Sequence, residues 1–282
     1  MPELPEVETI RRALEPALVN AVIESTSVRT PRLRTPLPAE ELDNFSRHSK
    51  VLDVRRRSKY IIVEIESLKS LIIHLGMTGN IRIEHTPNEP LEQYCSRHDH
   101  VIWKLKDGRA MFFNDPRRFG MVIMQHLPAA GALPPCLAHI GPEPYDEKFT
   151  GHYLYKKTRN CRRTIKDVIL DQSIVAGIGN IYASEILFHA RIIPRKKACN
   201  IGLTRYKRLV QSIRTILDKA IAAEGTTISD YTTLTGTEGQ FSQFLKVYGK
   251  KGEECPRCGS NHKIRQTTVN GRSTFYCPHC QH

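Results

Sequence analysis

The spacing of apolar residues predicts a helix at the start of the chain. Between about Pro5 and Ala17, apolar side chains recur at intervals of three and four residues, which is the period of one helix face. They are Val7, Ile10, Leu14 and Leu18. Proline and glutamates at the beginning of this stretch suit the first turn of a helix. We therefore expect one helix here, anchored by its apolar face.

From about Ala21 to Met124 the pattern changes to short runs rich in β-branched and aromatic residues. The clearest runs are 60–65, 71–75, 101–105 and 121–124. Several short strands separated by turn residues are typical of a sandwich or barrel. This region is expected to form a β-sandwich.

The stretch 127–145 is rich in proline and glycine, which predicts a linker. Beyond it, apolar residues recur at helical spacing from Leu203 to Ala220 and end before Gly225, a residue suited to a helix C-terminus. The second half is therefore expected to be helical. Residues 226–239 are rich in threonine, serine and glycine without periodicity, which predicts a mobile loop.

The charge balance favours a polyanionic partner. The 282 residues include 42 Lys and Arg against 29 Asp and Glu, a net charge of +13. Nucleic acid is the first candidate and an anionic membrane surface the second. No apolar run approaches the ~18 residues that a membrane span needs, and the first residues lack the positive and apolar segments of a secretion signal. We expect a cytoplasmic, nucleoid-associated protein.

Four of the eight cysteines are clustered near the carboxyl end. They form two C-x-x-C pairs, Cys255 with Cys258 and Cys277 with Cys280, separated by 18 residues. This spacing is typical of a zinc ribbon, in which four thiolates complete the metal's coordination shell and make it structural. A redox pair is the alternative. The other cysteines are scattered and are expected to be reduced thiols.

Between the two pairs, residues 266–276 are β-prone on both sides of Asn270-Gly271. Asn-Gly is the strongest sequence signal for a two-residue hairpin. The sequence therefore predicts a hairpin held by zinc, with Arg272 at its tip. An exposed arginine there is a candidate phosphate contact, although such a residue is usually only solvated.

Pro2 follows Met1 and would carry a free secondary amine if the initiator were removed. Such an amine can attack an electrophilic carbon and form an iminium, as a catalytic lysine does. Glu3 and Glu6 lie close enough in the sequence to transfer protons. Met-Pro starts are common and usually inert, so this segment alone only raises the possibility of covalent chemistry.

Four motifs carry a resemblance to a known family. They are residues 2–9 (PELPEVET), 115–120 (DPRRFG), 177–185 (GIGNIYASE) and the paired cysteines. In this order they closely resemble the formamidopyrimidine-DNA glycosylases, and the resemblance spans essentially the whole chain. It implies a DNA repair enzyme that excises oxidised purines such as 8-oxoguanine and formamidopyrimidines, then cleaves the abasic strand by β- and δ-elimination.

The resemblance also implies roles for individual residues. Pro2 would be the nucleophile, Glu3 the acid and base, and Lys59 a lysine beside the lesion that tunes the site. Glu6 would be a supporting carboxylate, although stabilisation of the helix N-terminus accounts for it equally well. Arg272 would contact the phosphate at the reacting nucleotide.

Further residues match DNA contacts of the family. Those expected to bind DNA are His74, Arg117, Lys166, Asn180, Tyr248 and Arg272. Those expected to fill the void left by the flipped nucleotide are Met77, Arg117 and Phe119. Without the resemblance, Met77 and Phe119 would be assigned to the core and His74 to a satisfied position in an apolar strand.

The expected architecture is multidomain α+β. A catalytic β-sandwich with an N-terminal helix covers residues 1–135, a helix-two-turns-helix DNA-binding domain covers 136–250, and a zinc-ribbon hairpin covers 251–282. The expected cofactor is one structural zinc ion, the partner is damaged double-stranded DNA rather than a membrane, and the protein is expected to be a monomer.

Thr78 and Lys250 depart from the family pattern. Two alternatives are the related endonuclease VIII branch and a catalytically silent DNA-binding protein on the same scaffold.

Overall fold

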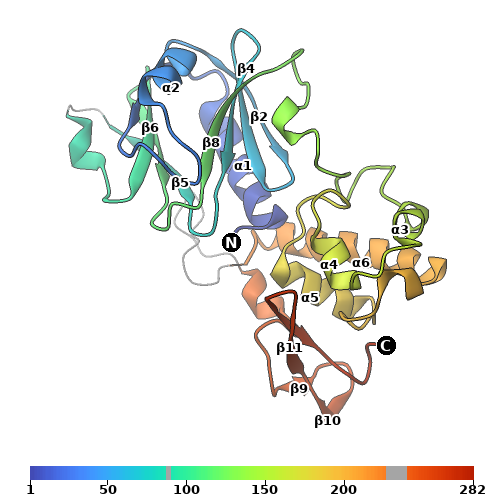
Figure 1. Cartoon of the computed structure of the whole chain (residues 1–282). Helices are drawn as coiled ribbons and strands as arrows, with labels where there is room; N and C mark the ends of the chain where they lie inside the picture. Colours follow the sequence, from blue (N-terminus) through green and yellow to red (C-terminus); the bar gives the residue numbers. More distant parts are fainter. Residues whose placement is uncertain (87–89, 227–239) are drawn as a thin grey trace. The chain divides into compact units, whose positions relative to one another are not determined.

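The computed structural model describes residues 1–86, 90–226 and 240–282, which fall into two compact units. The first unit contains residues 1–138 together with Thr226, and the second contains residues 139–225 and 240–282 (Figure 1). Most of the predicted loop at 226–239 lies outside the described residues, so that prediction stays open.

The first unit is a sandwich of two antiparallel four-stranded sheets (Figure 1). One sheet has the order β1 (Ile23–Val28), β6 (Asp99–Leu105), β7 (Arg109–Asn114), β5 (Asn80–His85). The other has the order β2 (Val51–Arg57), β3 (Tyr60–Ile65), β4 (Lys69–His74), β8 (Met121–His126). The predicted β-sandwich is confirmed, and the apolar side chains of both sheets form its core around the fully buried Trp103.

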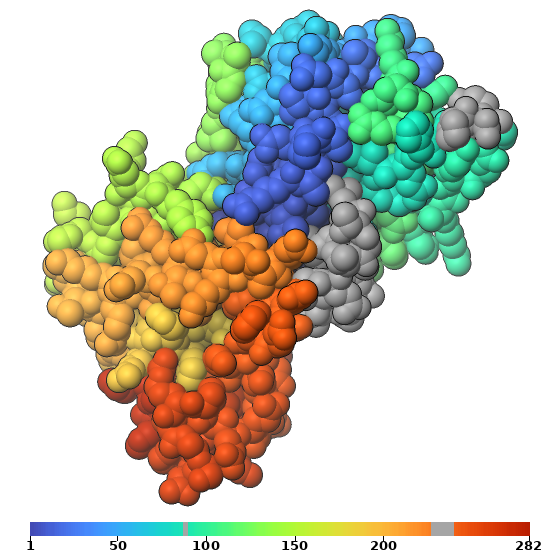
Figure 2. All heavy atoms as spheres, turned by 180° about the vertical axis from the view of Figure 1, so that it is seen from behind, coloured from blue at the N-terminus to red at the C-terminus, as the bar shows by residue number. Residues whose placement is uncertain are grey.

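Helix α1 (Leu4–Leu18) packs its predicted apolar face into this core. Its four apolar positions are each at most 1% exposed. Figure 2 shows the opposite face of α1, in dark blue, at the surface of the unit. The short helix α2 (Ala39–Ser46) was not predicted; it is fixed to β1 by hydrogen bonds such as the one between Thr26 Oγ1 and Ser46 Oγ, 2.7 Å long.

The second unit is helical, as the sequence predicts. It contains α3 (Gly151–Thr158), α4 (Ile165–Leu170), α5 (Asn180–His189) and α6 (Leu203–Ala222). Helix α6 forms an orange band on the surface in Figure 2 and ends before Gly225, whose φ of 85° is accessible to glycine. Among the helices in the described ranges, none has the length and apolar content needed to cross a membrane.

The same unit ends in two small antiparallel ribbons. One pairs β9 (Glu254–Cys255) with β10 (Gly259–Lys263), and the other pairs β11 (Arg265–Val269) with β12 (Arg272–Tyr276). Asn270 and Gly271 have φ angles of 47° and 74°, the left-handed conformation that a type I′ turn needs. The predicted hairpin with Arg272 beside its tip is confirmed. Short 3₁₀ turns, at 91–94, 135–137, 198–200 and 241–244, complete the fold.

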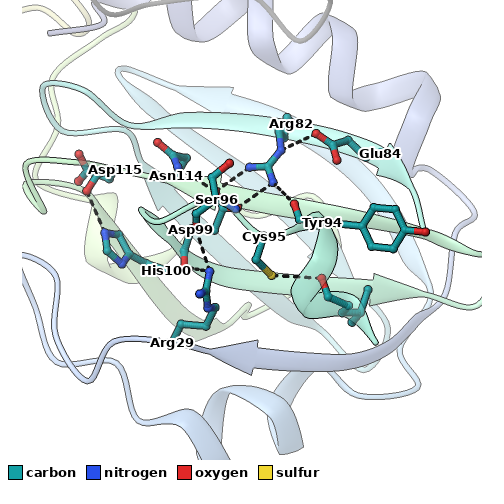
Figure 3. Close-up of polar contacts among 11 residues, drawn as sticks. Arg29, Arg82, Glu84, Tyr94, Cys95, Ser96, Asp99, His100, Asn114 and Asp115 are labelled. Atoms are coloured by element: carbon teal, nitrogen blue, oxygen red, sulfur yellow. Dashed lines mark hydrogen bonds and ion pairs between the residues drawn. The ribbon is translucent and has the colours of Figure 1, made fainter. Parts of the chain in front are cut away.

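A polar cluster crosses the outer face of the sheet that contains β5, β6 and β7 (Figure 3). The guanidinium of Arg82 donates to both carboxylate oxygens of Asp99, at 2.6 and 2.7 Å, and lies 4.1 Å from the centre of the Phe112 ring. Asn114 Nδ2 and the Ser96 N–H also donate to Asp99, whose side chain is fully buried. Four donated hydrogen bonds thus compensate the burial of one carboxylate.

These contacts decide the charge of Asp99. Burial by itself would raise the pKa of the carboxyl, but hydrogen bonds from Arg82, Asn114 and Ser96 outweigh burial and hold the pKa below its usual value. Asp99 is therefore ionised at neutral pH. It begins β6 and holds the strand in place close to the functional loops described below.

Replacing Arg82 by methionine should lower the free energy of unfolding by about 3 kcal/mol, because the buried Asp99 carboxylate would lose its ionic partner. Arg109→Met on the neighbouring strand is the matched control: Arg109 pairs with Asp107, which is 44% exposed, and its loss should cost less than about 1 kcal/mol. Urea unfolding of both variants measures the difference. Equal costs would contradict the assignment of Asp99 as a carboxylate that depends on Arg82.

Candidate active site, insertion loops and zinc centre

The first residues of the chain are fixed by one carboxylate. Glu6 Oε2 accepts a hydrogen bond from the Glu3 N–H at 2.7 Å, and Glu6 Oε1 accepts one from the Thr226 N–H at 2.8 Å. Glu3 and Glu6 are each 2% exposed, and Pro2 is buried. Glu6 therefore holds Pro2 and Glu3 still and ties them to a segment 220 residues away in the sequence.

The environment of the amino terminus favours a neutral amine. Burial lowers the pKa of the terminal amine, which Met1 carries in the structure. Glu3 and Glu6 raise the pKa, whereas Lys59 and Arg117 lower it, and the net pKa lies below the ordinary value of 8.0. A neutral amine has the lone pair that a nucleophile needs.

Lys59 lies in the tight turn between β2 and β3 and is 7% exposed. Arg56 positions this turn: it donates to the Ser58 carbonyl oxygen at 2.9 Å and forms a 3.0 Å ion pair with Glu8 on α1. From sequence alone, a cluster of arginines before a strand is more often a solvated face than a set of structural contacts. Arg56 instead joins helix α1 to the turn that carries Lys59. Its partner Glu8 is 48 residues away in the sequence, so no local signal identifies the pair.

His74, the last residue of β4, is 9% exposed. Its Nδ1 accepts a hydrogen bond from the Gly76 N–H at 3.0 Å, so the neutral ring carries its proton on Nε2. Burial, followed by the positive charges of Lys59 and Arg34, lowers the pKa of His74 to about 4. At neutral pH the ring can donate one hydrogen bond from Nε2 without carrying charge.

Two loops present apolar side chains to solvent, and we call residues 75–79 and 115–120 the insertion loops. Met77 is 41% exposed in the first and Phe119 is 45% exposed in the second. The guanidinium of Arg117 lies 5.1 Å from the centre of the Phe119 ring. The structure thus excludes the core assignment that composition alone would give Met77 and Phe119.

In the second unit, several candidate DNA contacts converge on the hairpin. Lys166 is fully buried, and its Nζ donates to the Ser273 carbonyl oxygen at 3.1 Å and to Thr274 Oγ1 at 2.6 Å. Asn180 Nδ2 donates to the same Ser273 oxygen at 3.0 Å. Lys166 and Asn180 therefore brace the strand next to the exposed Arg272.

Tyr248 is held by a residue that sequence reasoning did not select. The buried carboxylate of Glu185, on α5, accepts the backbone N–H groups of residues 246, 247 and 248 at 2.8 to 2.9 Å. The Tyr248 ring packs against Phe275 with a centroid distance of 5.1 Å. Glu185 is part of the quoted GIGNIYASE motif, but its partners are 61 to 63 residues away and no local signal identifies them.

The four clustered cysteines fit a zinc ion. Their Sγ atoms all lie within 4.8 Å of one another, with Cys255 and Cys280 at 4.0 Å and Cys258 and Cys277 at 3.8 Å. Tetrahedral zinc with bonds of about 2.3 Å separates its sulfurs by about 3.8 Å. When bound, the ion would crosslink the two ribbons over a small core that includes Phe188, Val247 and Phe275. The scattered cysteines are free thiols, as predicted.

Comparison with known proteins decides the family. Three family models match successive parts of the chain: "Formamidopyrimidine-DNA glycosylase N-terminal domain" over residues 1–122, "Formamidopyrimidine-DNA glycosylase H2TH domain" over 140–232 and "Zinc finger found in FPG and IleRS" over 252–282. The chain belongs to the formamidopyrimidine-DNA glycosylase family. It is thus a member of a family of DNA glycosylases, and the expected family resemblance is confirmed.

Relatives support this family membership over the full length. Formamidopyrimidine-DNA glycosylase of Nitrosococcus oceani is 44% identical across 100% of both chains. That of Magnetococcus marinus is 42% identical, covering 100% of this chain and 99% of its own. Among solved structures, Lactococcus lactis Fpg in a "complex" with "an abasic site containing DNA" has a TM-score of 0.85 at 36% identity and covers 99% of each chain. The MutM (Fpg) protein from Thermus thermophilus has a TM-score of 0.85 at 35% identity, covering 99% of this chain and 98% of its own.

Removing zinc should unfold the ribbons without unfolding the helices of the same unit, because the ribbon core is small and zinc binding supplies much of its folding free energy. Cys277→Ser should lower the zinc content below one ion per chain, and amide exchange should lose protection in 265–276 but not in α6. Cys199→Ser, which changes a cysteine outside the cluster, is the control and should keep the zinc. Unchanged protection after verified metal loss would contradict a structural zinc.

His74 should make the protein less stable in acid. The pKa is about 4 in the folded chain against an ordinary 6.5, so between these values the unfolded chain binds a proton that the folded chain does not. The free energy of unfolding should therefore fall as pH is lowered from about 6.5 towards 4, by roughly 3 kcal/mol from this residue. His74→Asn, which keeps an acceptor for Gly76, should show a flatter pH profile. His139→Asn, an exposed control, should retain the wild-type slope; identical profiles for all three proteins would refute this role.

Proposed function

We propose that the protein is a bifunctional DNA glycosylase and abasic-site lyase that excises oxidised purines from double-stranded DNA, using the amine of Pro2 as nucleophile. The carrying observation is the amino terminus, where Pro2 is buried beside the buried carboxylates of Glu3 and Glu6. Burial, Lys59 and Arg117 lower the pKa of the terminal amine, carried by Met1, at this position. Amino termini ordinarily fray and remain charged. A terminus held in this way is suited to covalent catalysis.

The proposed reaction requires that Met1 is removed. The Pro2 nitrogen attacks C1′ of the damaged nucleotide, and the bond to the base breaks with its electron pair leaving on the base, which takes up a proton. The Pro2 nitrogen gives up its proton, and the C1′–O4′ bond then breaks with its electron pair leaving on O4′, which takes up a proton. The iminium formed by this ring opening withdraws electrons and acidifies the C2′ proton. Loss of that proton expels the 3′ phosphate, and a second elimination expels the 5′ phosphate.

Glu3 and Lys59 supply the remaining chemistry in this proposal. Glu3 is the proton donor and acceptor, since it is adjacent to Pro2 and its backbone is fixed by Glu6. Lys59 stabilises negative charge on the phosphate beside the reacting nucleotide and disfavours protonation of the amine. Glu6 holds Pro2 and Glu3 in place, because its two carboxylate oxygens accept hydrogen bonds from the Glu3 and Thr226 backbone N–H groups.

Damaged duplex DNA is the proposed substrate. The Lactococcus lactis relatives were solved with abasic and Fapy-dG DNA, and the net charge of +13 suits a polyanion. A damaged base must leave the helix to reach a buried amine, at a cost of a few kcal/mol. We propose that Met77, Arg117 and Phe119 fill the space that the extruded nucleotide leaves in the DNA helix. The exposure of the Met77 and Phe119 side chains supports this role.

We further assign phosphate binding to His74, Asn180, Tyr248 and Arg272, with Arg272 next to the reacting nucleotide. Lys166 was expected to contact DNA directly; its bonds to Ser273 and Thr274 support a role in holding the hairpin that carries Arg272. The division into domains at 1–135, 136–250 and 251–282 is part of the same proposal.

Borohydride trapping tests the nucleophile, because it reduces an iminium to a stable amine. We expect the native protein to form a covalent adduct with 8-oxoguanine duplex and abasic duplex, and peptide mapping to place the adduct on a fragment that begins with Pro2. A chain that keeps an extension before Pro2 should lose trapping and lesion excision by roughly 10³-fold or more, since its nitrogen is an amide.

The same extension placed at the carboxyl end is the control and should leave trapping intact. An adduct mapped to Lys59, or an active chain with the amino-terminal extension, would eliminate Pro2 as nucleophile. Tight DNA binding without any adduct or excision would favour a catalytically silent DNA-binding protein.

A further inference from the structure

The two insertion loops share one buried hydrogen-bonded centre. Thr78 Oγ1, in the first loop, donates to Asp115 Oδ1 at 2.7 Å and accepts the Arg117 N–H at 3.3 Å. Asp115 Oδ2 accepts the Gly120 N–H at 2.7 Å. Thr78 is 9% exposed and Asp115 is fully buried, so these bonds are protected from water.

Backbone contact strengthens the connection between the loops. Gly76 has a φ of 64°, and a Cβ there would lie 2.4 Å from the carbonyl carbon of Phe119. A Cβ on Gly120 would lie 2.6 Å from the Phe113 ring and 3.0 Å from the His74 carbonyl oxygen. Real Cβ atoms do not come within 3.0 Å of such neighbours, so the first loop packs directly against the backbone of Phe119 only because position 76 is glycine. Gly120 fits in the same way against the Phe113 ring.

The centre is also anchored to the β-sheet. The Asp115 N–H donates to the His98 carbonyl oxygen at 3.0 Å, and His100 Nε2 lies 2.9 Å from the Asp115 carbonyl oxygen (Figure 3). The preceding residue, Asn114, donates to Asp99. Asp115 is therefore held by its backbone to β6 while its side chain holds both insertion loops.

From this geometry we propose that Thr78 and Asp115 are positioning residues that lock the two insertion loops into one rigid unit. The proposal rests on the proposed function, in which Met77 and Phe119 enter the DNA together. Side chains ordered before binding lose less conformational freedom when they bind. The rigid centre would thus stabilise the state in which the damaged nucleotide is extruded and the void is filled.

The orientation of Thr78 gives this proposal a distinct signature. Its hydroxyl is directed to Asp115 inside the protein and is already engaged as donor and acceptor. If Thr78 recognised the damaged base, replacing it would slow the excision of one lesion more than that of another. If Thr78 positions the insertion loops, replacing it slows the excision of every lesion that must be extruded from a duplex.

Thr78→Val tests the proposal, because valine keeps the shape and removes the hydroxyl. Under single-turnover conditions we expect about tenfold slower excision of both 8-oxoguanine and formamidopyrimidine from duplex DNA. Strand cleavage of a single-stranded abasic oligonucleotide, which has no void to fill, should stay within about twofold of wild type. Thr78→Ser, which keeps the hydroxyl, should restore the duplex rate.

Thr86→Val is the matched control: Thr86 is 5% exposed in the same unit, and its hydroxyl donates to the Gly108 carbonyl oxygen at 3.3 Å, outside the insertion loops. It should leave duplex excision unchanged. In a Met77→Ala background, Thr78→Val should reduce the rate of duplex excision by a smaller factor than in wild type, because the Met77 side chain that Thr78 positions is already absent.

Three outcomes would overturn the proposal: wild-type duplex excision by Thr78→Val, loss confined to one lesion, or equal slowing on the single-stranded abasic oligonucleotide. Failure of the proposed function is separable, because it would abolish borohydride trapping and excision in the wild-type protein itself. Should Thr78→Val fail to fold, Asp115→Asn tests the same centre: it should slow duplex excision of both lesions while retaining single-stranded cleavage, and a wild-type duplex rate would overturn the proposal.

Discussion

The first residues of a chain are normally its least ordered part, yet the candidate nucleophile is the second residue. The structure meets this constraint with the carboxylate of Glu6, which accepts two backbone N–H groups from opposite parts of the sequence. Helix α1 completes the restraint because its apolar face is buried in the sandwich. The position of the candidate nucleophile is therefore set by the core of the first unit and not by the terminus itself.

Buried carboxyl groups that accept backbone hydrogen bonds also lie behind other candidate DNA-facing residues. Asp115 accepts a hydroxyl and a backbone N–H behind the insertion loops, and Glu185 accepts three backbone N–H groups behind Tyr248. A buried carboxylate without partners is strongly unfavourable, so each tolerates little displacement of the loop that it holds. Buried carboxyl groups that accept backbone hydrogen bonds thus give rigidity to segments that must remain exposed in order to bind a polyanion.

Periodicity and turn chemistry were enough to predict α1, the sandwich strands β3, β4, β6 and β8, α6 and the Asn270-Gly271 hairpin, since these depend on neighbours in the sequence. The zinc cluster was equally accessible because its ligands recur at fixed spacing. The roles of Arg56, Glu185 and the buried Lys166 were not, because each depends on a partner 48 or more residues away. Charged residues look alike in sequence whether they are solvated or buried with a partner.

This distinction changes how the net charge of +13 is interpreted. Arg82 pairs with the buried Asp99 and Arg56 with the partly buried Glu8, and both pairs stabilise the fold. Arg117, on a loop, and Arg272, at the start of β12, are exposed. The field available to DNA therefore comes from a subset of the basic residues. Met77 and Phe119 are likewise exposed, and in the proposed function their apolar side chains fill the void in the DNA. In the proposal above, the hydrogen bonds of Thr78 and Asp115 order the loops that carry these side chains before DNA binds.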